Sequence, residues 1–567
     1  MRIRLAALAL ATSALVACTS ATGPSATGEN ASTAVSAPKV QKLVMALPPP
    51  AVEANNLTEA AHTSFWQVAP MYEYLVGLTA EGKELVPQLA TEWSLEPDGK
   101  SYRFKLRHGV PFHNGFGEFT AKDVRYTWQM LSNGEPAMIQ GQNTYMTLIK
   151  DATVVNDYEV VLNAATPDAG FLVSISQAEN IFPQASKNDG ESRGKGWKLP
   201  SMLEKPYAGT GPYQYVSRQQ SSNLAYKRPA EAHWRQTPDF PEFEFRFAKE
   251  NSTRQAALLA KEVQMAVIPP DLAKSMEQSG FKTVEGRAAG LHIFGRLYGA
   301  FLNTRHDPAE VLNPDPNATY VFPNSPFLDV NVRKALNKAI NRDALNKAFI
   351  RGKGQPIYLE YYHPDRPGWN PDWQKNFQAS YGYDVDGARK ALADAGYTPA
   401  RPLDITVEVA PNPLFSGAPD VAEALGNYWQ AAGFKVTLDT ADPTSVAAKR
   451  RALTLPELDR RVAVFVTSAR QLLGVGVFNS AMRLTRGGVQ LPEMEEVYKQ
   501  IVVTLDSKKQ GDLWRKWGDM AYERYLNIPL FWLPAEIVVD PAVVQDYVFP
   551  GSISGTYTHV EYTKAVR

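Results

Sequence analysis

The spacing of apolar and polar residues predicts strands at several places along the chain. In the clearest cases the two kinds of residue alternate, as they do in a strand with one buried face. The first predicted strand ends at Pro48-Pro49-Pro50, since proline cannot donate to a sheet. Strands are predicted over residues 40–47, 101–106, 154–162, 243–247 and 529–539.

Helical spacing is clearest from Asp329 onward. Asp329 can cap a helix, and Asp343 predicts the start of a second, short one. Thr120-Ala-Lys-Asp123 has the form of a capping box before another helix. Further helices are predicted over 252–264 and 492–525. The stripe that follows Asp329 consists of Val332, Ala335, Leu336, Ala339 and Ile340.

Residues 404–438 predict a complete strand–helix–strand unit. Alternating strands occupy its two ends, and an apolar helix face lies between them. Gly433 stands where the helix must stop with a positive φ. Such crossovers build parallel sheets with helices on their faces, so the chain is predicted to belong to the α/β class.

The N-terminus predicts an export signal. Arg2 and Arg4 precede an apolar run that is too short to span a bilayer, and the run ends in Leu15-Val16-Ala17-Cys18. This ending resembles the bacterial lipobox, so residues 1–18 are predicted to be a lipoprotein signal with Cys18 as the lipidated residue. The alternative is a plain secretory leader with an incidental cysteine. Residues 19–38 hold almost no large apolar side chains and predict a flexible tether.

The composition of the chain is typical of a globular protein with equal numbers of positive and negative side chains. Apolar residues make up 44% of the chain, which is enough for a large core. Lys plus Arg and Asp plus Glu are equal at 59 each, so no overall field favours nucleic acid. Cys18 is the only cysteine, which excludes a disulfide within the chain.

Motifs of catalysis are absent from the sequence. It contains neither a G-x-S-x-G elbow nor an H-E-x-x-H pair. Gly99-Lys100-Ser101 lacks the first glycine of a phosphate loop, and Gly209-Thr210-Gly211 is better explained as a tight turn. His108 and His113 have no carboxylate or cysteine placed to complete a metal site. No cofactor, metal or catalytic residue is therefore expected.

Many aromatic residues fall in polar, proline-rich segments, where their burial is not obvious. Aromatic walls with a few polar groups suit a small-molecule cleft. The alternative, in which these rings anchor loops to the core, is equally compatible with any single residue. The segments hold Phe65-Trp66, Tyr145, Tyr298, Tyr361-Tyr362 and Trp369.

Several motifs, in order along the chain, resemble the family 5 extracellular solute-binding proteins. This family comprises oligopeptide, dipeptide and nickel binders that serve ABC importers. The most diagnostic block is Asp98 to Gly115 followed by Thr120-Ala-Lys-Asp-Val124. The other matching segments are Tyr72–Val76, Leu85–Trp93, Gly209–Tyr213, Phe301–Thr304, Pro326–Leu336 and Tyr383–Leu392 with Ala395-Gly396.

The resemblance implies a two-lobed periplasmic-binding-protein fold, type II of the large cluster, with a subdomain inserted in lobe I. It places lobe I at 39–76, 205–300 and 511–567, the inserted subdomain at 77–204 and lobe II at 301–510. A small solute, peptide-like or otherwise organic, would bind between the lobes and pass to an ABC permease and ATPase. The expected protein is a periplasmic, lipid-anchored monomer without enzymatic activity. The alternative is a sensing or chaperone-like lipoprotein of the same fold.

The resemblance also implies which residues contact the solute. Peptide-binding members place a carboxylate in a second-lobe loop, but the nearest equivalent here, 462–476, contains Arg470 as its only charge. Arg470 either holds an anionic group of the solute or points to solvent. The predicted contacts are Thr63, Ser64, Phe65, Trp66, Tyr145, Tyr298, Asn303, Tyr361, Trp369, Phe415 and Arg470.

Overall fold

The computed structural model describes the chain between residues 37 and 567, apart from several segments. Residues 38–567 form one compact unit. The signal, Cys18 and nearly all of the predicted tether lie outside the described residues. The ranges described are 37–50, 53, 57, 65–81, 84–133, 149–178, 182–193, 207–286, 291–302, 317, 319–410, 415, 417–440, 445–446, 449–450, 452–468, 488–548 and 559–567.

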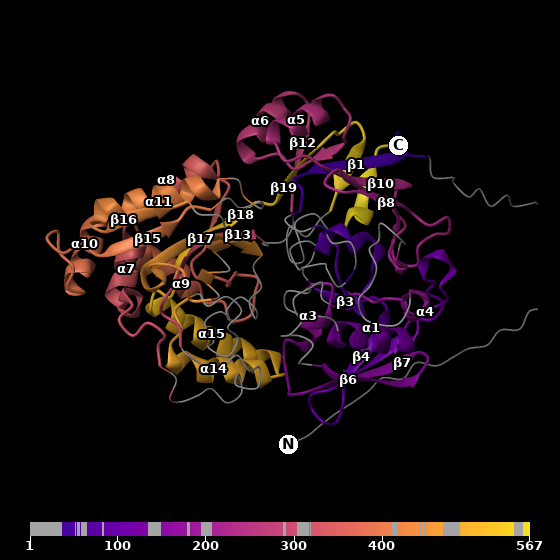
Figure 1. Cartoon of the computed structure of the whole chain (residues 1–567), viewed down its shortest axis with the longest axis horizontal. Coiled ribbons are helices and arrows are strands. Elements are labelled where there is room, and N and C mark those ends of the chain that lie inside the picture. Colours follow the sequence, from indigo (N-terminus) through magenta and orange to yellow (C-terminus); the bar gives the residue numbers. More distant parts are fainter. Residues whose placement is uncertain are drawn as a thin grey trace, which may run out of the picture. The chain divides into compact units, whose positions relative to one another are not determined.

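The first sheet has seven strands in the order β12-β19-β11-β1-β10-β9-β8 (Figure 1). Its centre is β1, which runs parallel to β10 and β11 and pairs Phe245 with Met45. Helices α5 (Asn251–Leu259) and α6 (Pro270–Gln278) cover one face, where Leu258 and Met276 pack against Val44 and Val538. The strands are β1 (Lys42–Leu47), β8 (Gln214–Gln219), β9 (Asn223–Lys227), β10 (Glu242–Phe247), β11 (Met265–Ala266), β12 (Lys282–Glu285) and β19 (Glu536–Val539).

A four-stranded antiparallel sheet, β4-β5-β7-β6, is built from residues 90–164. Helix α1 (Ala121–Asn133) packs on it and starts as predicted, because the backbone N–H and hydroxyl of Thr120 both donate to Asp123. The single strand predicted over 154–162 is wrong, since the chain turns at Asp157-Tyr158 and forms a hairpin. The strands are β4 (Ala90–Leu95), β5 (Tyr102–Leu106), β6 (Ile149–Asn156) and β7 (Glu159–Ala164).

The remaining elements of the first half of the chain are short. A two-stranded ribbon joins β2 to β3, and the helices α3 and α4 follow β7. These elements are β2 (Val76–Leu78), β3 (Leu85–Pro87), α3 (Phe171–Ile175) and α4 (Lys187–Ser192).

The second large sheet has six strands in the order β14-β18-β13-β17-β15-β16. The predicted strand–helix–strand unit is confirmed as β15, α11 (Ala418–Ala432) and β16, with the two strands parallel and Gly433 at φ 103°. Helix α7 (Val330–Lys338) begins where expected, because the Asp329 side chain accepts from the backbone N–H of Asn331 at 2.7 Å. The strands are β13 (Leu291–Leu297), β14 (Gln355–Pro356), β15 (Asp404–Glu408), β16 (Lys435–Asp439), β17 (Arg461–Ser468) and β18 (Ile528–Leu533).

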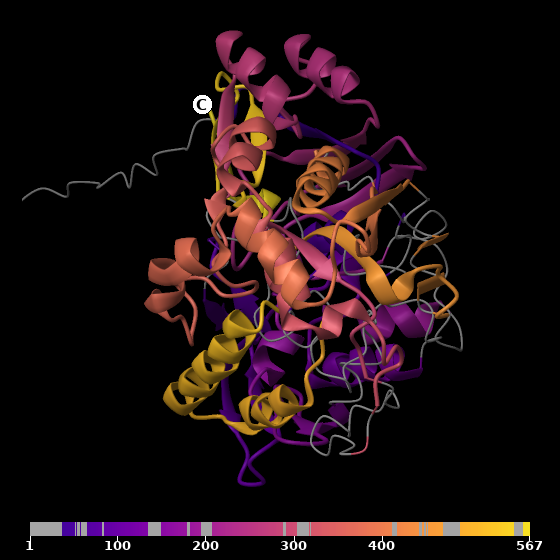
Figure 2. The same cartoon turned by 90° about the vertical axis from the view of Figure 1, so that its left-hand side faces the viewer.

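Three other predicted helices differ from the structure. The helix predicted over 252–264 ends at Leu259. The helix predicted from Asp343 begins at Arg342 under an Asn341 cap. The helical stretch 492–525 is a pair, α14 (Pro492–Val503) and α15 (Ser507–Glu523), which pack together (Figure 2). The remaining helices are α8 (Arg342–Phe349), α9 (Pro371–Tyr381) and α10 (Val385–Asp394).

Two antiparallel strand pairs join the two large sheets. Strands β12 and β19 pair in the first sheet, with Glu285 opposite Glu536, and β13 and β18 pair in the second, with Leu291 opposite Leu533. The stretch predicted as one strand over 529–539 is therefore two strands in different sheets. The predicted boundaries at 300 and 510 assign β13 and β18 to lobe I, and these boundaries stay a prediction. Both strands lie in the second sheet.

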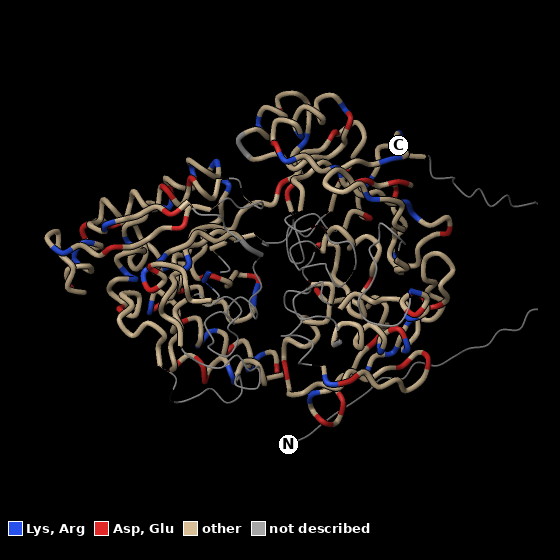
Figure 3. The backbone as a smooth tube through the Cα atoms, in the orientation of Figure 1, with Lys and Arg blue, Asp and Glu red and all other residues tan. Residues whose placement is uncertain are grey.

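Two basic residues between α8 and β14 meet acidic residues of the first sheet where these strands pass from one sheet to the other. Lys353 Nζ lies 3.0 Å from Glu285, and it also forms an ion pair with Glu536. Arg351 contacts Glu536 at 3.1 Å. Elsewhere in the described part of the chain, Lys and Arg are intermixed with Asp and Glu (Figure 3). No described helix has the length and apolarity needed to cross a membrane.

The two ends of this unit are held close together. The backbone N–H of Lys39 donates to the carbonyl of Val566 at 3.2 Å. Near the C-terminus, Arg235 donates to Glu73 at 2.8 Å, to Glu561 at 2.9 Å and to the Tyr562 hydroxyl at 3.0 Å. Both carboxylates are almost completely buried, so Arg235 neutralises two charges that have no access to water.

Replacing Arg235 with methionine should lower the free energy of unfolding by about 3–5 kcal/mol, because two buried carboxylates lose their partner. Urea denaturation followed by circular dichroism measures the loss. The matched control is Arg103→Met, whose side chain bridges Glu96 and Glu159 at a partly exposed site. That change should cost about 1 kcal/mol or less, and equal losses in the two variants would contradict the role given to Arg235.

Candidate functional site

The two faces of the six-stranded sheet differ in chemistry. Leu291, Ile293 and Leu297 of β13 lie on the same side of the sheet as Leu438 of β16, by the register of the paired strands. Helix α11 covers this side, since a Cβ added to its Gly426 would lie 3.1 Å from the Leu438 side chain. The opposite side carries ionisable and aromatic groups and is called the polar face below. It consists of His292, Phe294, Arg296, Thr406, Glu408, Arg461, Phe465 and Trp532, brought together by the pairing of β13, β15, β17 and β18.

Two arginines and three aromatic rings form an arginine–aromatic cluster on this face: Arg296, Tyr298, Tyr361, Arg450 and Phe465. The Arg296 guanidinium lies 4.2 Å from the ring centre of Phe465, and that of Arg450 lies 5.8 Å from the same centre. Arg296 donates to the Tyr361 hydroxyl at 3.2 Å, and Arg450 donates to the Tyr298 hydroxyl at 2.9 Å. Both guanidinium groups are thus held by phenols and ring faces in a buried setting.

Carboxylates near this cluster are engaged mainly with Arg461. Its guanidinium contacts Asp439 at 2.6 Å and Glu408 at 3.9 Å. Burial raises the pKa of Glu408, while Arg450 and Arg461 oppose that rise. No carboxylate in the described part of the chain forms an ion pair with Arg450, and its Nε atom has no hydrogen-bond partner there.

A second buried group adjoins the cluster. Glu360 accepts a hydrogen bond from the Asn527 side chain, and its other oxygen lies 3.6 Å from His292 Nε2. Burial raises the pKa of Glu360 to about 8, and the nearby Arg296 only partly offsets this effect. Glu360 is therefore mostly protonated at neutral pH.

The polar face extends to a hollow at the edge of the sheet. This hollow of about 450 Å³ lies over β15 and β16, and its lining includes Thr406, Thr437 and Arg460. The paired Arg461 and Asp439 also line the hollow, so the hollow adjoins the buried ionic groups of the polar face. Threonine hydroxyls and paired charges make its wall polar.

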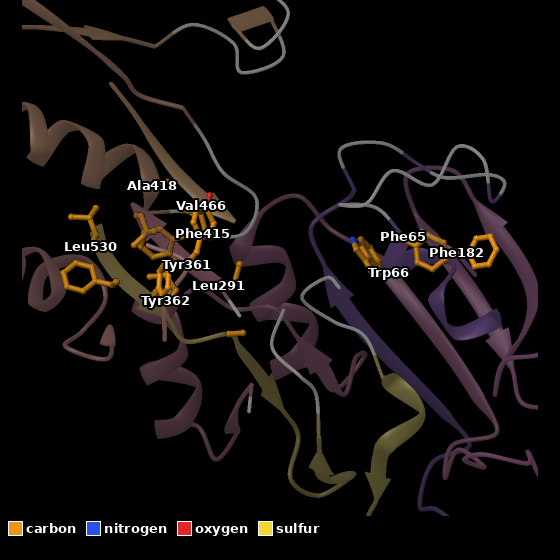
Figure 4. Close-up of a cluster of buried hydrophobic side chains, with 14 of the residues drawn as sticks. Phe65, Trp66, Phe182, Leu291, Tyr361, Tyr362, Phe415, Ala418, Val466 and Leu530 are labelled. Atoms are coloured by element: carbon orange, nitrogen blue, oxygen red, sulfur yellow. The ribbon is translucent and has the colours of Figure 1, made fainter. Parts of the chain in front are cut away.

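The structure places only part of the predicted contact set on this face. Tyr298 and Tyr361 belong to the arginine–aromatic cluster. Trp369 lies elsewhere and packs against Trp373 with ring centres 5.5 Å apart. Figure 4 labels Phe415, which is also buried, among the side chains around the second sheet.

The first-sheet residues of the prediction are core residues. Phe65 and Trp66 occupy a 3₁₀ turn, η1 (Phe65–Gln67), and Figure 4 shows their side chains. The Trp66 ring meets that of Phe245 of β10 edge-on, with ring centres 5.0 Å apart. The predicted contact of Phe65 and Trp66 with solute stays a prediction, as does that of the other residues. Thr63, Ser64, Tyr145, Asn303 and Arg470 lie outside the described residues.

Sequence reasoning missed His292, Arg296, Glu360 and Arg450. A signal for two of them exists, because His292 and Arg296 interrupt the otherwise apolar run 291–297 at positions that share one face. Glu360 and Arg450 carry no comparable signal. Arg450 sits in the basic run Lys449-Arg450-Arg451, which reads as a solvated surface.

Histidines and carboxylates do not converge into a metal site within the described ranges, where no group of three such ligands occurs. His113 Nε2 lies 2.8 Å from the carbonyl of Gly211, and burial lowers the pKa of its ring to about 4. His108 stacks on Tyr158 with ring centres 3.6 Å apart.

Solved structures with this arrangement of sheets are periplasmic binding proteins. The protein DppA from Helicobacter pylori, in complex with the peptide STSA, matches with a TM-score of 0.71 at 19% identity, over 92% of this chain and 97% of its own. AgaA from A. tumefaciens, in complex with agropinic acid, matches with a TM-score of 0.69 at 17% identity, over 93% and 99%. The chain therefore has the two-lobed α/β fold of this class.

The family follows from residues 84–467, which match the model of the bacterial extracellular solute-binding proteins, family 5. The chain belongs to that family, as its motifs predicted. The dipeptide-binding protein of Escherichia coli is 27% identical over 65% of this chain and 66% of its own length. Heme-binding protein A of Haemophilus influenzae is 26% identical over 66% and 65%. The match thus spans just under two thirds of the length of these relatives.

The buried Glu360 predicts a pH-dependent stability. Its folded pKa of about 8 lies above that of an unfolded glutamate, so the folded state binds the proton more tightly. The free energy of unfolding should then fall as the pH rises from about 4 to about 8. Glu360→Gln removes this dependence and should make the protein more stable than wild type at pH 9, by about 1 kcal/mol or more.

Thermal unfolding at pH 6 and pH 9 tests this expectation. The matched control is Glu242→Gln, at an exposed position on β10, which should change neither value. A wild type and a Glu360→Gln variant that lose stability in parallel between the two pH values would show that Glu360 does not titrate as argued.

Proposed function

We propose that the protein is the solute-binding component of an ABC importer. It captures a peptide-like or other small organic solute between its lobes and delivers it to the permease and ATPase. The observation that carries this proposal is the family membership of residues 84–467, together with a fold shared over nearly the whole length of solved periplasmic binding proteins. The buried arginine–aromatic cluster supplies the recognition chemistry that such a role needs.

The proposal includes a closing motion of the two lobes. The sheets are linked by the adjoining strand pairs β12–β19 and β13–β18, so a change of twist in these short passages can move one lobe against the other. Solute drives closure only if it binds the closed form more tightly than the open form. The permease then recognises the closed form, and the chain itself catalyses no reaction.

Export and anchoring complete the proposed function. The basic, apolar and lipobox segments at the N-terminus support a periplasmic protein held to a membrane through lipid on Cys18. The equal numbers of acidic and basic residues support a protein that does not bind nucleic acid.

The solute need not be a peptide with a free amino group. Relatives and fold neighbours include proteins named for dipeptides, heme, glutathione and agropinic acid. Strand β17, the described part of the segment where peptide-binding members place a carboxylate, contains neither Asp nor Glu. A buried ammonium without a partner is costly, so this strand favours solutes other than ordinary peptides.

A thermal-shift screen tests the proposal. Purified protein is heated with di- and tripeptides, opines, phosphorylated sugars and nickel–histidine complexes. A true solute at a hundred times its Kd should add about 2.7 kcal/mol of stability and raise the Tm. Enantiomers of each hit serve as controls and should shift the Tm less.

Transport distinguishes uptake from the alternative of sensing. Deleting the gene should abolish uptake of the radiolabelled hit, and the intact gene should restore it. A hit whose uptake survives the deletion would point to the sensing or chaperone-like role instead.

A further inference from the structure

The part of the chain that carries the four-stranded sheet touches the part that carries the second large sheet. On one side lies the loop after β7, which leads into α3, where Phe171 stacks on Tyr102 of β5 with ring centres 5.0 Å apart. On the other side lies α14, which packs with α15, the helix that leads into β18. The backbone N–H of Ala169 donates to the carbonyl of Val502 at 2.7 Å and joins the two sides.

This hydrogen bond is made at the end of a helix. The last four carbonyls of an α-helix have no donor within the helix, and Val502 is one residue before the end of α14. Ala169 therefore supplies a donor that α14 itself lacks. The contact has an apolar part as well, because Tyr498, one turn earlier on α14, and Phe171 of α3 are both buried in the same hydrophobic cluster.

Asp168 brings a carboxyl group into this contact. Its side chain lies in a residue that is only 7% exposed, and Oδ1 accepts a hydrogen bond from the backbone N–H of Gly170 at 2.8 Å. Burial raises the pKa of Asp168 to about 6, and this hydrogen bond only partly offsets the effect. An ionised Asp168 would also stand one residue from the contact with the negative end of the α14 dipole.

No Lys or Arg in the described part of the chain forms an ion pair with Asp168. The titratable groups that face it are Tyr102 of β5 and Tyr498 of α14, and burial, followed by the charge of Asp168, raises the pKa of both phenols. Lys100 reaches the same loop, but it donates to the Ala165 carbonyl at 3.4 Å. The ionised form of Asp168 is therefore favoured when the contact opens and water reaches the carboxylate.

We propose that this contact is a proton-sensitive latch between the two lobes, which closes when Asp168 binds a proton and loosens when the proton leaves. The inference rests on the proposed function, since it concerns how the lobes of the same binding protein open and close. The stabilisation by the proton is complete below the ordinary pKa of an aspartate, about 4. It is lost as the pH rises through the pKa of about 6 in the latched state.

Distances between spin labels on the two lobes, without solute, test the latch. Cys18 is the only cysteine, so the full chain with Cys18→Ala, Arg125→Cys and Glu423→Cys carries one label on α1 and one on α11, both at exposed positions. Pulsed EPR should show that the ratio of latched to open molecules falls roughly 10-fold from pH 5 to pH 8. Asp168→Asn imitates the neutral carboxyl group and should keep the latched distance at both pH values.

The comparison of variants assigns the effect, because Glu73 and Glu360 also titrate near neutral pH. Asp372→Asn, at an exposed position of α9, is the matched control and should keep the pH dependence of the wild type.

Three outcomes would overturn the latch. They are a wild-type distance that does not change with pH, an Asp168→Asn variant that opens with rising pH as the wild type does, and an Asp168→Asn variant that is open at both pH values. The last would show that the charged carboxylate holds the contact. A thermal-shift screen without any hit would count against the proposed function instead, since the distance measurement needs no solute.

Discussion

The pairing of β12 with β19 and of β13 with β18 is the constraint on which both large sheets depend. Strand β19 lies between β12 and β11 in the first sheet, although it follows every strand of the second sheet in the chain. The first sheet is therefore complete only when the chain has passed through the second sheet and returned. Pairing between segments so far apart in the chain forms slowly, so β19 is expected to be among the last strands added to the first sheet.

The second sheet also buries charged side chains on one of its faces, which costs stability. A structural sheet would carry aliphatic side chains on both faces under flanking helices, as the α11 side of this sheet does. The polar face instead buries His292, Arg296 and Arg461 among rings and carboxylates. Such groups lower stability unless they are paired. Here Arg461 is paired with Asp439, and Arg296 is held by the Tyr361 hydroxyl and the Phe465 ring.

Local sequence patterns predicted the ends of helices well. They failed where contacts between distant segments determine how a stretch is divided into strands. The capping of α1 and α7 and the stop at Gly433 depend on residues a few positions apart, so the sequence contains the whole cause. The hairpin of β6 and β7 and the division of 529–539 between two sheets depend on partners elsewhere in the chain. Periodicity cannot separate two adjacent strands that continue the same apolar run. In the candidate site, loop composition indicated Tyr298 and Tyr361, whose contact with solute stays a prediction. The position of Arg296 beside Phe465 follows from the pairing of β13 with β17, which local patterns do not contain.

The hydrogen bond between Lys39 and Val566 has a consequence for how this chain could be rearranged. Residues next to the two ends of the unit, Lys39 and Val566, are backbone neighbours, so a short linker could join these ends. New ends could then be opened in the exposed turn at Asp98-Gly99 between β4 and β5. In such a circular permutant β1 would follow β10 and β11 in the chain instead of preceding them. The refolding rate of the permutant would show whether folding depends on the order of these three strands along the chain.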